Sequence, residues 1–233
     1  MNSITFVTPE AQAKYVAEEV SALLASAITS RGTAILAVSG GKSPLRLFEI
    51  LRTQSIAWDR VTICLVDERW VPPDHERSNE KLVRLHLMQE NASPSTFISV
   101  YNAGSTPVEA AQALSAMFGD EASLSSGIDV AILGMGDDGH TASWFPRSRE
   151  LGHCFSTPDA YAAVSAEEGR DARVTMTLSA VSKTRKIILC VEGEVKRAVL
   201  AKAAEGSDTD SMAQYPVSAA LRLRGGQVSI RVA

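Results

Sequence analysis

Four apolar runs, each followed at once by a loop rich in glycine or charged residues, constrain the fold of this chain most. A strand that faces water on one side alternates polar and apolar residues, whereas these runs are apolar at nearly every position and indicate strands buried on both faces. Helical patterns occupy the intervals between them. The runs are TAILAV (33–38), VTICLV (61–66), IDVAIL (128–133) and KIILCV (186–191). We therefore expect an α/β protein in which helices cover both faces of a parallel sheet.

The predicted helices begin at recognisable signals. Thr8 can cap a helix and Pro9 can occupy its first turn, which predicts a helix from there to about Ser30. Pro44 similarly opens a helix that reaches Leu51. Further helices are predicted at 78–86, 107–118, 194–204 and 216–223, and shorter strands at 4–7, 161–164 and 173–178. In such a sheet the loops at the carboxyl ends of the strands form the functional site.

Length and composition fit one compact unit with a local binding site. The chain has 233 residues, of which 45% are hydrophobic, so it can build one core and we expect a single domain over 1–233. The formal net charge of -4 argues against a nucleic-acid partner, which would require a broad basic face. Any anion-binding site must therefore be a local cluster of cations.

The sequence also predicts where in the cell the protein is found. It has no stretch of about 18 apolar residues and no cationic leader followed by an apolar segment, so we expect no membrane association. Cys64, Cys154 and Cys190 form no C-x-x-C pair, and two of them lie in apolar runs, which indicates buried thiols in a reducing compartment. We expect a cytoplasmic protein that is a monomer or a small homo-oligomer.

The first motif with chemical content is AVSGGKSP (37–44), where a buried strand ends in two glycines and a helix begins. Glycines let the backbone approach a ligand, and the N–H groups at the start of a helix suit a phosphate. A nucleotide-binding P-loop is excluded, because it needs a glycine where Leu36 stands. A tight turn without a ligand explains the motif equally well.

The second motif, VDERWVPPDHERSN (66–79), sets Asp67, Glu68 and Arg69 directly after a buried strand. Charges in that position lie over the ligand face of the sheet. A solvated turn would account for the two prolines that follow, but it accounts less well for the run of three charged residues. We therefore favour a functional role for this segment.

The third motif, LGMGDDGHTASWFP (133–146), sets His140 on a glycine-rich loop after another buried strand. A histidine there is poorly placed for the core and well placed to act as a base. The histidines show no metal-ligand spacing with cysteine or glutamate, so we expect no metal, and no G-x-S-x-G motif provides a serine nucleophile.

The fourth pattern concerns two cations. Arg173 begins a predicted strand, and Lys196 lies in the first turn of a predicted helix, where its charge opposes the helix dipole. That position is unfavourable unless the lysine meets an anion. The residues alone favour a solvent-exposed lysine.

Taken together and in this order, SGGKSP, DERWVP with DHERSN, GMGDDGHTASWFP, RVTMT and EGEVK resemble the 6-phosphogluconolactonase family, which belongs to a larger group with glucosamine-6-phosphate deaminases. The resemblance covers roughly residues 10 to 205. Deaminases typically carry Asp-Glu-Tyr where this chain has Asp67-Glu68-Arg69. The resemblance implies a modified Rossmann-like α/β fold without a metal or an organic cofactor.

By motif match, the resemblance also assigns residues to the phosphate of the substrate. The implied phosphate-binding residues are Gly40, Gly41, Arg173 and Lys196, with Arg69 close by and with Lys42 and Ser43 in the same loop as the glycines. A dianionic phosphate supplies the anion that the position of Lys196 requires. Lys42 departs from the small residue more common in the family, and it either adds a phosphate contact or points to solvent.

The implied substrate is the small molecule 6-phospho-D-glucono-1,5-lactone, and the expected reaction is attack of water on its ring ester. Neutral His140 would take the proton of the water, and either Asp67 or Asp138 would orient the imidazole. Asp138 aligns with the Asp-Gly-His of the family. Arg69 or backbone N–H groups near Gly41 or Gly139 would stabilise the oxyanion.

Two other functions fit parts of the same pattern. A deaminase and isomerase of an amino-sugar phosphate would use Asp67 as a carbon base, but Arg69 and the DGHTAS-x-FP run argue against it. A non-catalytic sugar-phosphate sensor would have no need of His140 and would carry a DNA-binding or partner segment, for which the sequence has no basic arm or helix-turn-helix extension.

Overall fold

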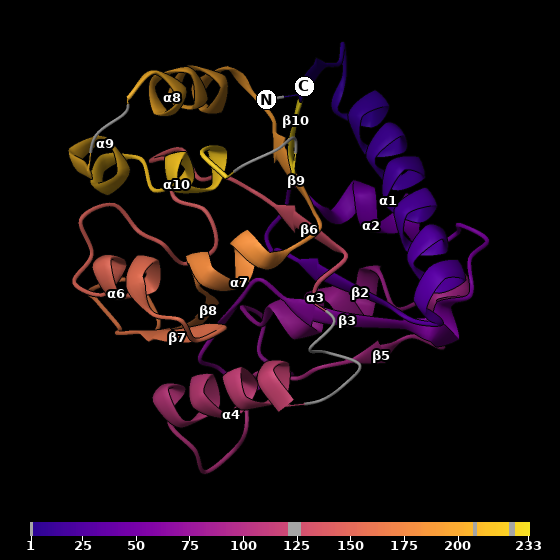
Figure 1. Cartoon of the computed structure of the whole chain (residues 1–233), viewed down its shortest axis with the longest axis horizontal. Helices are drawn as coiled ribbons and strands as arrows, with labels where there is room; N and C mark the ends of the chain where they lie inside the picture. Colours follow the sequence, from indigo (N-terminus) through magenta and orange to yellow (C-terminus); the bar gives the residue numbers. More distant parts are fainter. Residues whose placement is uncertain (1, 121–126, 207–208, 224–226) are drawn as a thin grey trace.

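Parallel strands form the centre of the molecule in the computed structural model, which describes residues 2–120, 127–206, 209–223 and 227–233. The order in this seven-stranded sheet is β1-β10-β9-β6-β2-β3-β5, and every neighbouring pair is parallel (Figure 1). The strands are β1 (Asn2–Thr5), β2 (Ala34–Val38), β3 (Val61–Leu65), β5 (Thr96–Phe97), β6 (Val130–Leu133), β9 (Lys186–Val191) and β10 (Val228–Val232). The predicted α/β class is confirmed.

Helices cover both faces of this sheet, as predicted. Helices α1 and α2 lie together on one side, and α7 and α10 lie on the other (Figure 1). The helices are α1 (Pro9–Arg31), α2 (Leu45–Leu51), α3 (Asn79–His86), α4 (Pro107–Asp120), α6 (Leu151–Ser156), α7 (Leu178–Lys183), α8 (Glu194–Glu205), α9 (Thr209–Gln214) and α10 (Val217–Leu221). The sequence does not predict α6, α7 or α9, which have six residues each.

Helix α1 begins where the sequence predicts, because its first turn is capped. The Thr8 hydroxyl accepts a hydrogen bond from the N–H of Ala11 at 3.2 Å, and Pro9 occupies the first position. At the other end Gly32 adopts a left-handed conformation (φ +83°) and donates its N–H to the Ile28 carbonyl at 2.8 Å. Capping hydrogen bonds thus define both ends of the helix.

A second, antiparallel sheet of three strands lies beside the first; the sequence predicts two of its strands, 161–164 and 173–178, but not the sheet, and the second of them ends at Met176 rather than at 178. The sheet has the order β4-β8-β7, formed by Asp67–Arg69, Arg173–Met176 and Tyr161–Val164. The chain passes from one sheet to the other at Val66, whose N–H donates to the Val38 carbonyl at 2.9 Å and whose carbonyl accepts from the Met176 N–H at 2.7 Å. The charged run after β3 is therefore a strand rather than a loop.

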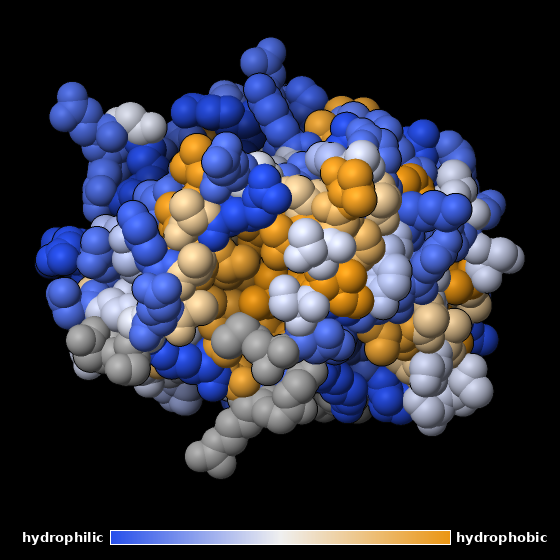
Figure 2. Space-filling view, turned by 90° about the horizontal axis from the view of Figure 1, so that it is seen from above, coloured by the Kyte–Doolittle hydropathy of each residue, from blue (hydrophilic) through white to orange (hydrophobic). Residues whose placement is uncertain are grey.

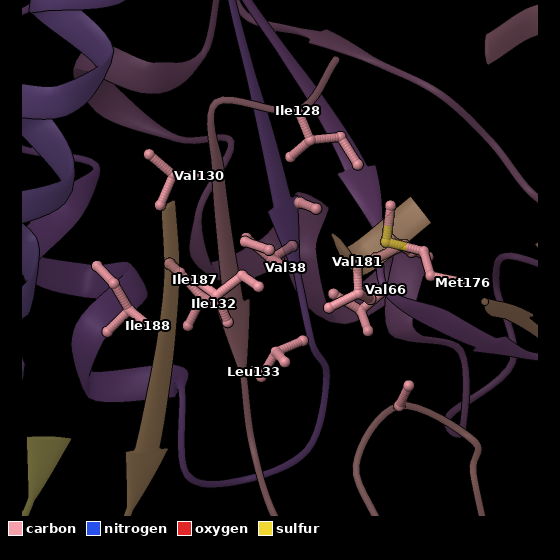
Figure 3. Packing of buried hydrophobic residues seen from close by; sticks show 14 of the residues in the cluster. Val38, Val66, Ile128, Val130, Ile132, Leu133, Met176, Val181, Ile187 and Ile188 are labelled. Atoms are coloured by element: carbon pink, nitrogen blue, oxygen red, sulfur yellow. The ribbon is translucent and has the colours of Figure 1, made fainter. Parts of the chain in front are cut away.

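One hydrophobic core joins the two sheets. Val38, Ile132 and Ile187 of the parallel sheet pack in the same cluster as Met176 of the antiparallel sheet and Val181 of α7 (Figure 3). These side chains are at most 2% exposed. Because a close-packed core does not yield easily, it fixes β4 and β8 relative to the ends of β2 and β6.

Figure 2 shows how apolar and hydrophilic residues are distributed on one face of the molecule. Seen from above, apolar residues gather in a central area that hydrophilic residues border (Figure 2). Among the described residues, no helix is both long and apolar enough to cross a membrane.

The two ends of the chain form adjacent strands, and the last one carries a buried charge. The sequence predicts a strand at 4–7, but β1 ends at Thr5 and Val7 is 98% exposed. Strand β10 (VSIRV), in which apolar and polar residues alternate, is not among the predicted strands. The Arg231 guanidinium is 1% exposed and donates to both carboxylate oxygens of Glu19 on α1, at 3.0 and 2.8 Å. This pair fastens α1 to the C-terminal strand.

Removing the carboxylate of Glu19 should destabilise the fold, because it leaves a buried guanidinium without its partner. We expect Glu19→Ala to lower the free energy of unfolding by about 3 kcal/mol, measured by urea denaturation. The neighbouring Glu18→Ala, at an exposed position, is the control and should change it by no more than about 0.5 kcal/mol. A loss below about 1 kcal/mol for Glu19→Ala would show that the pair contributes little.

Candidate active site

A cavity of about 320 Å³ lies where the parallel strands end. Its walls come from the loops that follow β2, β6 and β9, from α1, and from β4 and β8 of the second sheet. The predicted site residues that line it are Gly40, Gly41, Lys42, Ser43, Asp67, Arg69, His140, Arg173 and Lys196. The fold therefore brings together segments that are far apart in the sequence.

His140 lies at the end of a tight turn after β6. The N–H of Gly136 donates to the His140 carbonyl at 2.9 Å, and the N–H of Gly139 donates to the Gly136 carbonyl at 3.0 Å. Within this turn Oδ1 of Asp138 is 2.6 Å from Nδ1 of His140 and accepts the His140 backbone N–H at 3.0 Å. With Nδ1–H donated to the carboxylate, Nε2 is the nitrogen of the neutral ring that can accept a proton.

Asp138 is therefore the carboxylate that contacts the imidazole. Burial by itself would raise the pKa of Asp138, but the hydrogen bonds from the ring and the backbone N–H of His140 outweigh it and lower the pKa below its ordinary value. The group stays ionised near neutral pH, so it can orient the ring and stabilise its positive charge.

Asp67 has different partners. Its carboxylate is 7% exposed, accepts a hydrogen bond from the Ser143 hydroxyl at 2.7 Å and lies 3.5 Å from Nη1 of Arg173. Ser143 is held in turn by its N–H, which donates to Thr175 at 3.1 Å. Asp67 thus connects the loop after β6 to the second sheet, and in the described part of the chain it makes no hydrogen bond to His140.

Arg69 and Arg173 lie side by side across the second sheet. They are directly opposed in the antiparallel register of β4 and β8, and the Nε atom of each is buried without a hydrogen-bond partner among the described residues. Burial lowers the pKa of Arg173, the carboxylate of Asp67 raises it, and the charge of Arg69 lowers it further. Two adjacent guanidinium groups with unused donors favour an anion between them.

Phe145 packs among these groups and was not singled out from the sequence. Its ring centroid is 5.0 Å from that of His140, and the guanidinium carbon of Arg173 is 5.6 Å from the ring centroid. The guanidinium of Arg170 covers the same ring at 3.8 Å. Phe145 therefore packs against the imidazole and against the guanidinium groups of two arginines.

Glu68, the middle residue of the charged run, has a structural role. Its carboxylate is 1% exposed and accepts the N–H groups of Asn79 and Glu80, both at 2.8 Å, and the Ser78 hydroxyl at 3.0 Å. Burial raises the pKa of Glu68, and these hydrogen bonds oppose that rise. The carboxylate thereby binds the start of α3 to β4.

Asn79 also lines the cavity, and sequence reasoning missed it. Its Nδ2 donates to the Asp67 carbonyl at 2.7 Å, which directs Oδ1 toward Gly40. A Cβ atom on Gly40 would lie 1.9 Å from that oxygen. Gly40 is thus a glycine because the Asn79 amide occupies the space of a side chain, and Gly41 has the positive φ of +98° that favours glycine. The only sequence signal for Asn79 is its place beside the helix-capping Ser78.

Lys42 and Lys196 approach the cavity from two different elements. Lys42 and Ser43 are exposed in the loop after β2, and Lys196 is half-buried in the first turn of α8. Neither lysine has an ion-pair partner among the residues that the structure describes. Glu192 lines the same wall; burial raises its pKa, and the charges of Arg46 and Lys196 oppose that rise.

The three thiols are unpaired. Cys64 and Cys154 are buried as predicted, whereas Cys190 is half-buried and lines the cavity. Burial raises the pKa of each thiol to about 12, so none is a thiolate at neutral pH. No group of three or more possible metal ligands lies close together in the described part of the chain.

Comparison with known proteins agrees with this architecture. Residues 7–230 match the model of the family described as glucosamine-6-phosphate isomerases/6-phosphogluconolactonase. A 6-phosphogluconolactonase of Rhizobium meliloti is 40% identical over 231 residues, which cover 98% of this chain and 97% of the relative. The crystal structure of a 6-phosphogluconolactonase from Shewanella baltica has a TM-score of 0.92 at 37% identity, with 100% of this chain and 98% of that chain covered.

The fold is shared more widely. A monomeric glucosamine-6-phosphate deaminase has a TM-score of 0.81 at 17% identity, with 100% of this chain and 97% of that chain covered. At that identity the similarity concerns the fold alone. The chain belongs to the glucosamine-6-phosphate isomerase/6-phosphogluconolactonase family, and within it to the 6-phosphogluconolactonases.

The contact between Gly40 and Asn79 can be tested by a double-mutant cycle. Gly40→Ala should displace the Asn79 amide and the loop after β2, which we expect to raise KM for the substrate by about tenfold, equivalent to roughly 1.4 kcal/mol. Asn79→Ala removes the overlap, so the double variant should bind substrate better than Gly40→Ala alone. Additive effects of the two substitutions on KM would contradict this packing.

Proposed function

We propose that this chain hydrolyses 6-phospho-D-glucono-1,5-lactone to 6-phospho-D-gluconate, a reaction of the oxidative pentose phosphate pathway. The observation that carries the proposal is the Asp138–His140 pair at the wall of a cavity that four cations also line. A base and an anion-binding cluster in one cavity suit a phosphorylated substrate that is opened by water. The names of the relatives support the same reaction.

The phosphate of the substrate would bind to the loop after β2 and the cations around it. Gly40 and Gly41 allow the phosphate to approach the backbone, and Ser43 and Lys42 extend the same loop. Arg69, Arg173 and Lys196 would supply charge, and the unused Nε donors of the two arginines support this assignment. Binding the phosphate at a distance from the ester would position the ring for attack.

His140 would act as the general base. Its Nε2 takes a proton from water while the water oxygen bonds to the ring carbonyl carbon, and the carbonyl oxygen becomes an oxyanion. Asp138 orients the ring and stabilises the imidazolium, because it is the carboxylate on Nδ1. When the oxyanion collapses, the bond to the ring oxygen breaks, and the imidazolium returns its proton to that oxygen.

The hydrogen bonds of the turn reduce the number of groups that could donate a hydrogen bond to the oxyanion. The N–H of Gly139 is already donated to the Gly136 carbonyl, which removes one candidate that the sequence suggests. Arg69 and N–H groups near Gly41 remain as candidate donors.

We also propose that residues 1–233 work as one domain, because a single hydrophobic cluster includes both sheets.

Replacing His140 tests the base. We expect His140→Ala to lower kcat for freshly generated lactone by about 10²–10⁴-fold, corrected for the spontaneous rate, because the water loses its proton acceptor. His153→Ala, at an exposed position of α6, is the matched control and should retain the activity of the wild type. Parallel assays with glucosamine 6-phosphate test the rival: ammonia release without lactone opening would establish a deaminase, and no reaction with either compound would favour a sensor.

Replacing Lys196 tests the phosphate site. Lys196→Ala should lower kcat/KM for the phosphorylated lactone by about 10–100-fold, the loss of a charged hydrogen bond. It should leave the weak hydrolysis of phosphate-free gluconolactone unchanged, because that substrate makes no such contact. Lys202→Ala, at an exposed position of the same helix, is the control. An equal fall in kcat/KM for both substrates would place Lys196 at the ester rather than at the phosphate.

A further inference from the structure

The turn that carries Asp138 and His140 is held from outside by a segment near the end of the chain. Gly139 lies between the two catalytic candidates and is buried, with φ +84°. Its carbonyl accepts the N–H of Val217 at 3.0 Å. The turn is therefore closed by its own hydrogen bonds on one side and attached to the start of α10 on the other.

Tyr215 packs directly on Gly139. A Cβ atom placed on Gly139 would lie 2.9 Å from Cδ1 of Tyr215 and 3.2 Å from its Cα and Cβ. The backbone and the ring of Tyr215 thus occupy the space where any other residue would carry a side chain. This contact lies one residue from each member of the Asp138–His140 pair, so movement of Tyr215 would be transmitted to both.

The segment that carries Tyr215 is itself well anchored. The Tyr215 N–H donates to the Ser211 carbonyl at 2.8 Å, and the Tyr215 carbonyl accepts the Ser218 N–H at 2.9 Å. The residues of α10 are all buried, and α10 contacts α7 and α8. A second hydrogen bond comes from Arg147, which follows the loop that carries His140: its N–H donates to the Ala213 carbonyl at 3.0 Å. Such an anchored segment can hold the turn in place.

The same part of the chain also reaches the other side of the cavity. Lys196 lies in the first turn of α8, and α8, α9 and α10 follow one another and lie close together at one end of the molecule (Figure 1). This C-terminal stretch thus contacts the proposed phosphate site at its start and the Asp138–His140 turn at its end.

We propose that Tyr215 is a positioning residue that holds the Asp138–His140 pair in its working geometry by packing on Gly139. The proposal rests on the proposed function. The contact uses Cδ1 of the ring, Cα and Cβ of Tyr215, whereas in the described part of the chain its hydroxyl accepts one hydrogen bond, of 3.3 Å, from Gln214. The ring should therefore matter and the hydroxyl should not.

Steady-state kinetics with the full chain test the proposal. Tyr215→Ala should lower kcat for the lactone by about 10–100-fold, because a shift of the base by an ångström costs rate, and should change KM by less than about twofold, because the cations are unaltered. Tyr215→Phe should behave as the wild type. Met212→Ala on α9, a partly buried apolar residue outside the Gly139 contact, is the matched control and should retain kcat.

A second readout does not depend on turnover. In the wild type the Nδ1–H of His140, held by Asp138, should give a slowly exchanging proton resonance that is absent from His140→Asn. Tyr215→Ala should broaden or lose this resonance, and Met212→Ala should keep it. If Tyr215→Ala does not fold, Tyr215→Leu, which removes the flat ring but keeps apolar volume, replaces it in both measurements.

The outcomes separate the two proposals. If the wild type does not open the lactone, the proposed function fails, and the resonance still tests the role of Tyr215. If folded Tyr215→Ala or Tyr215→Leu keeps both kcat and the resonance, the positioning role is overturned. If Met212→Ala lowers kcat and weakens the resonance as much as Tyr215→Ala does, the positioning role is overturned as well, because the whole segment would then be loosened.

Discussion

Val66 lies between β3 and β4 and hydrogen-bonds to both sheets, and the site depends on that crossing. Its N–H continues the parallel sheet through the Val38 carbonyl, and its carbonyl opens the antiparallel sheet through the Met176 N–H. The side chain is fully buried, so the junction cannot shift without opening the core. The next residues, Asp67 and Arg69, are consequently directed toward the loops after β2 and β6.

Charge around the cavity falls into two groups. Two carboxylates have partners: Glu68 accepts the N–H groups at the start of α3, and Asp67 accepts from Ser143 and lies near Arg173, while Glu192 also lies on the cavity wall. Arg69 and Lys196 also lie on the wall, and among the residues that the structure describes the Nε of Arg69 has no hydrogen-bond partner and Lys196 has no ion-pair partner. An unmatched local positive charge in a chain of formal net charge -4 is what an anionic small-molecule substrate requires.

The sequence predicts the centre of the parallel sheet, because β2, β3, β6 and β9 are apolar runs and helices such as α1 have clear caps, but it does not predict the short β5 or the strand β10. It predicts β7 and β8 as strands but neither β4 nor their separate antiparallel sheet, since Asp67–Arg69 is short and charged and forms a strand only by pairing with Arg173–Met176. The sequence leaves open which aspartate contacts His140; the turn closed by Gly136 resolves this in favour of Asp138. The sequence does not single out Asn79, Phe145 or Tyr215 as individual residues, because their importance comes from contacts with distant residues.

The central claim is that the Asp138–His140 pair, and not Asp67, activates the water. The most direct measurement is kcat for the phosphorylated lactone with Asp138→Asn, which keeps the size of the side chain but cannot accept the Nδ1–H as a carboxylate does. We predict a fall of about 10²–10⁴-fold with KM within about threefold of the wild type. A kcat equal to that of the wild type would contradict the account.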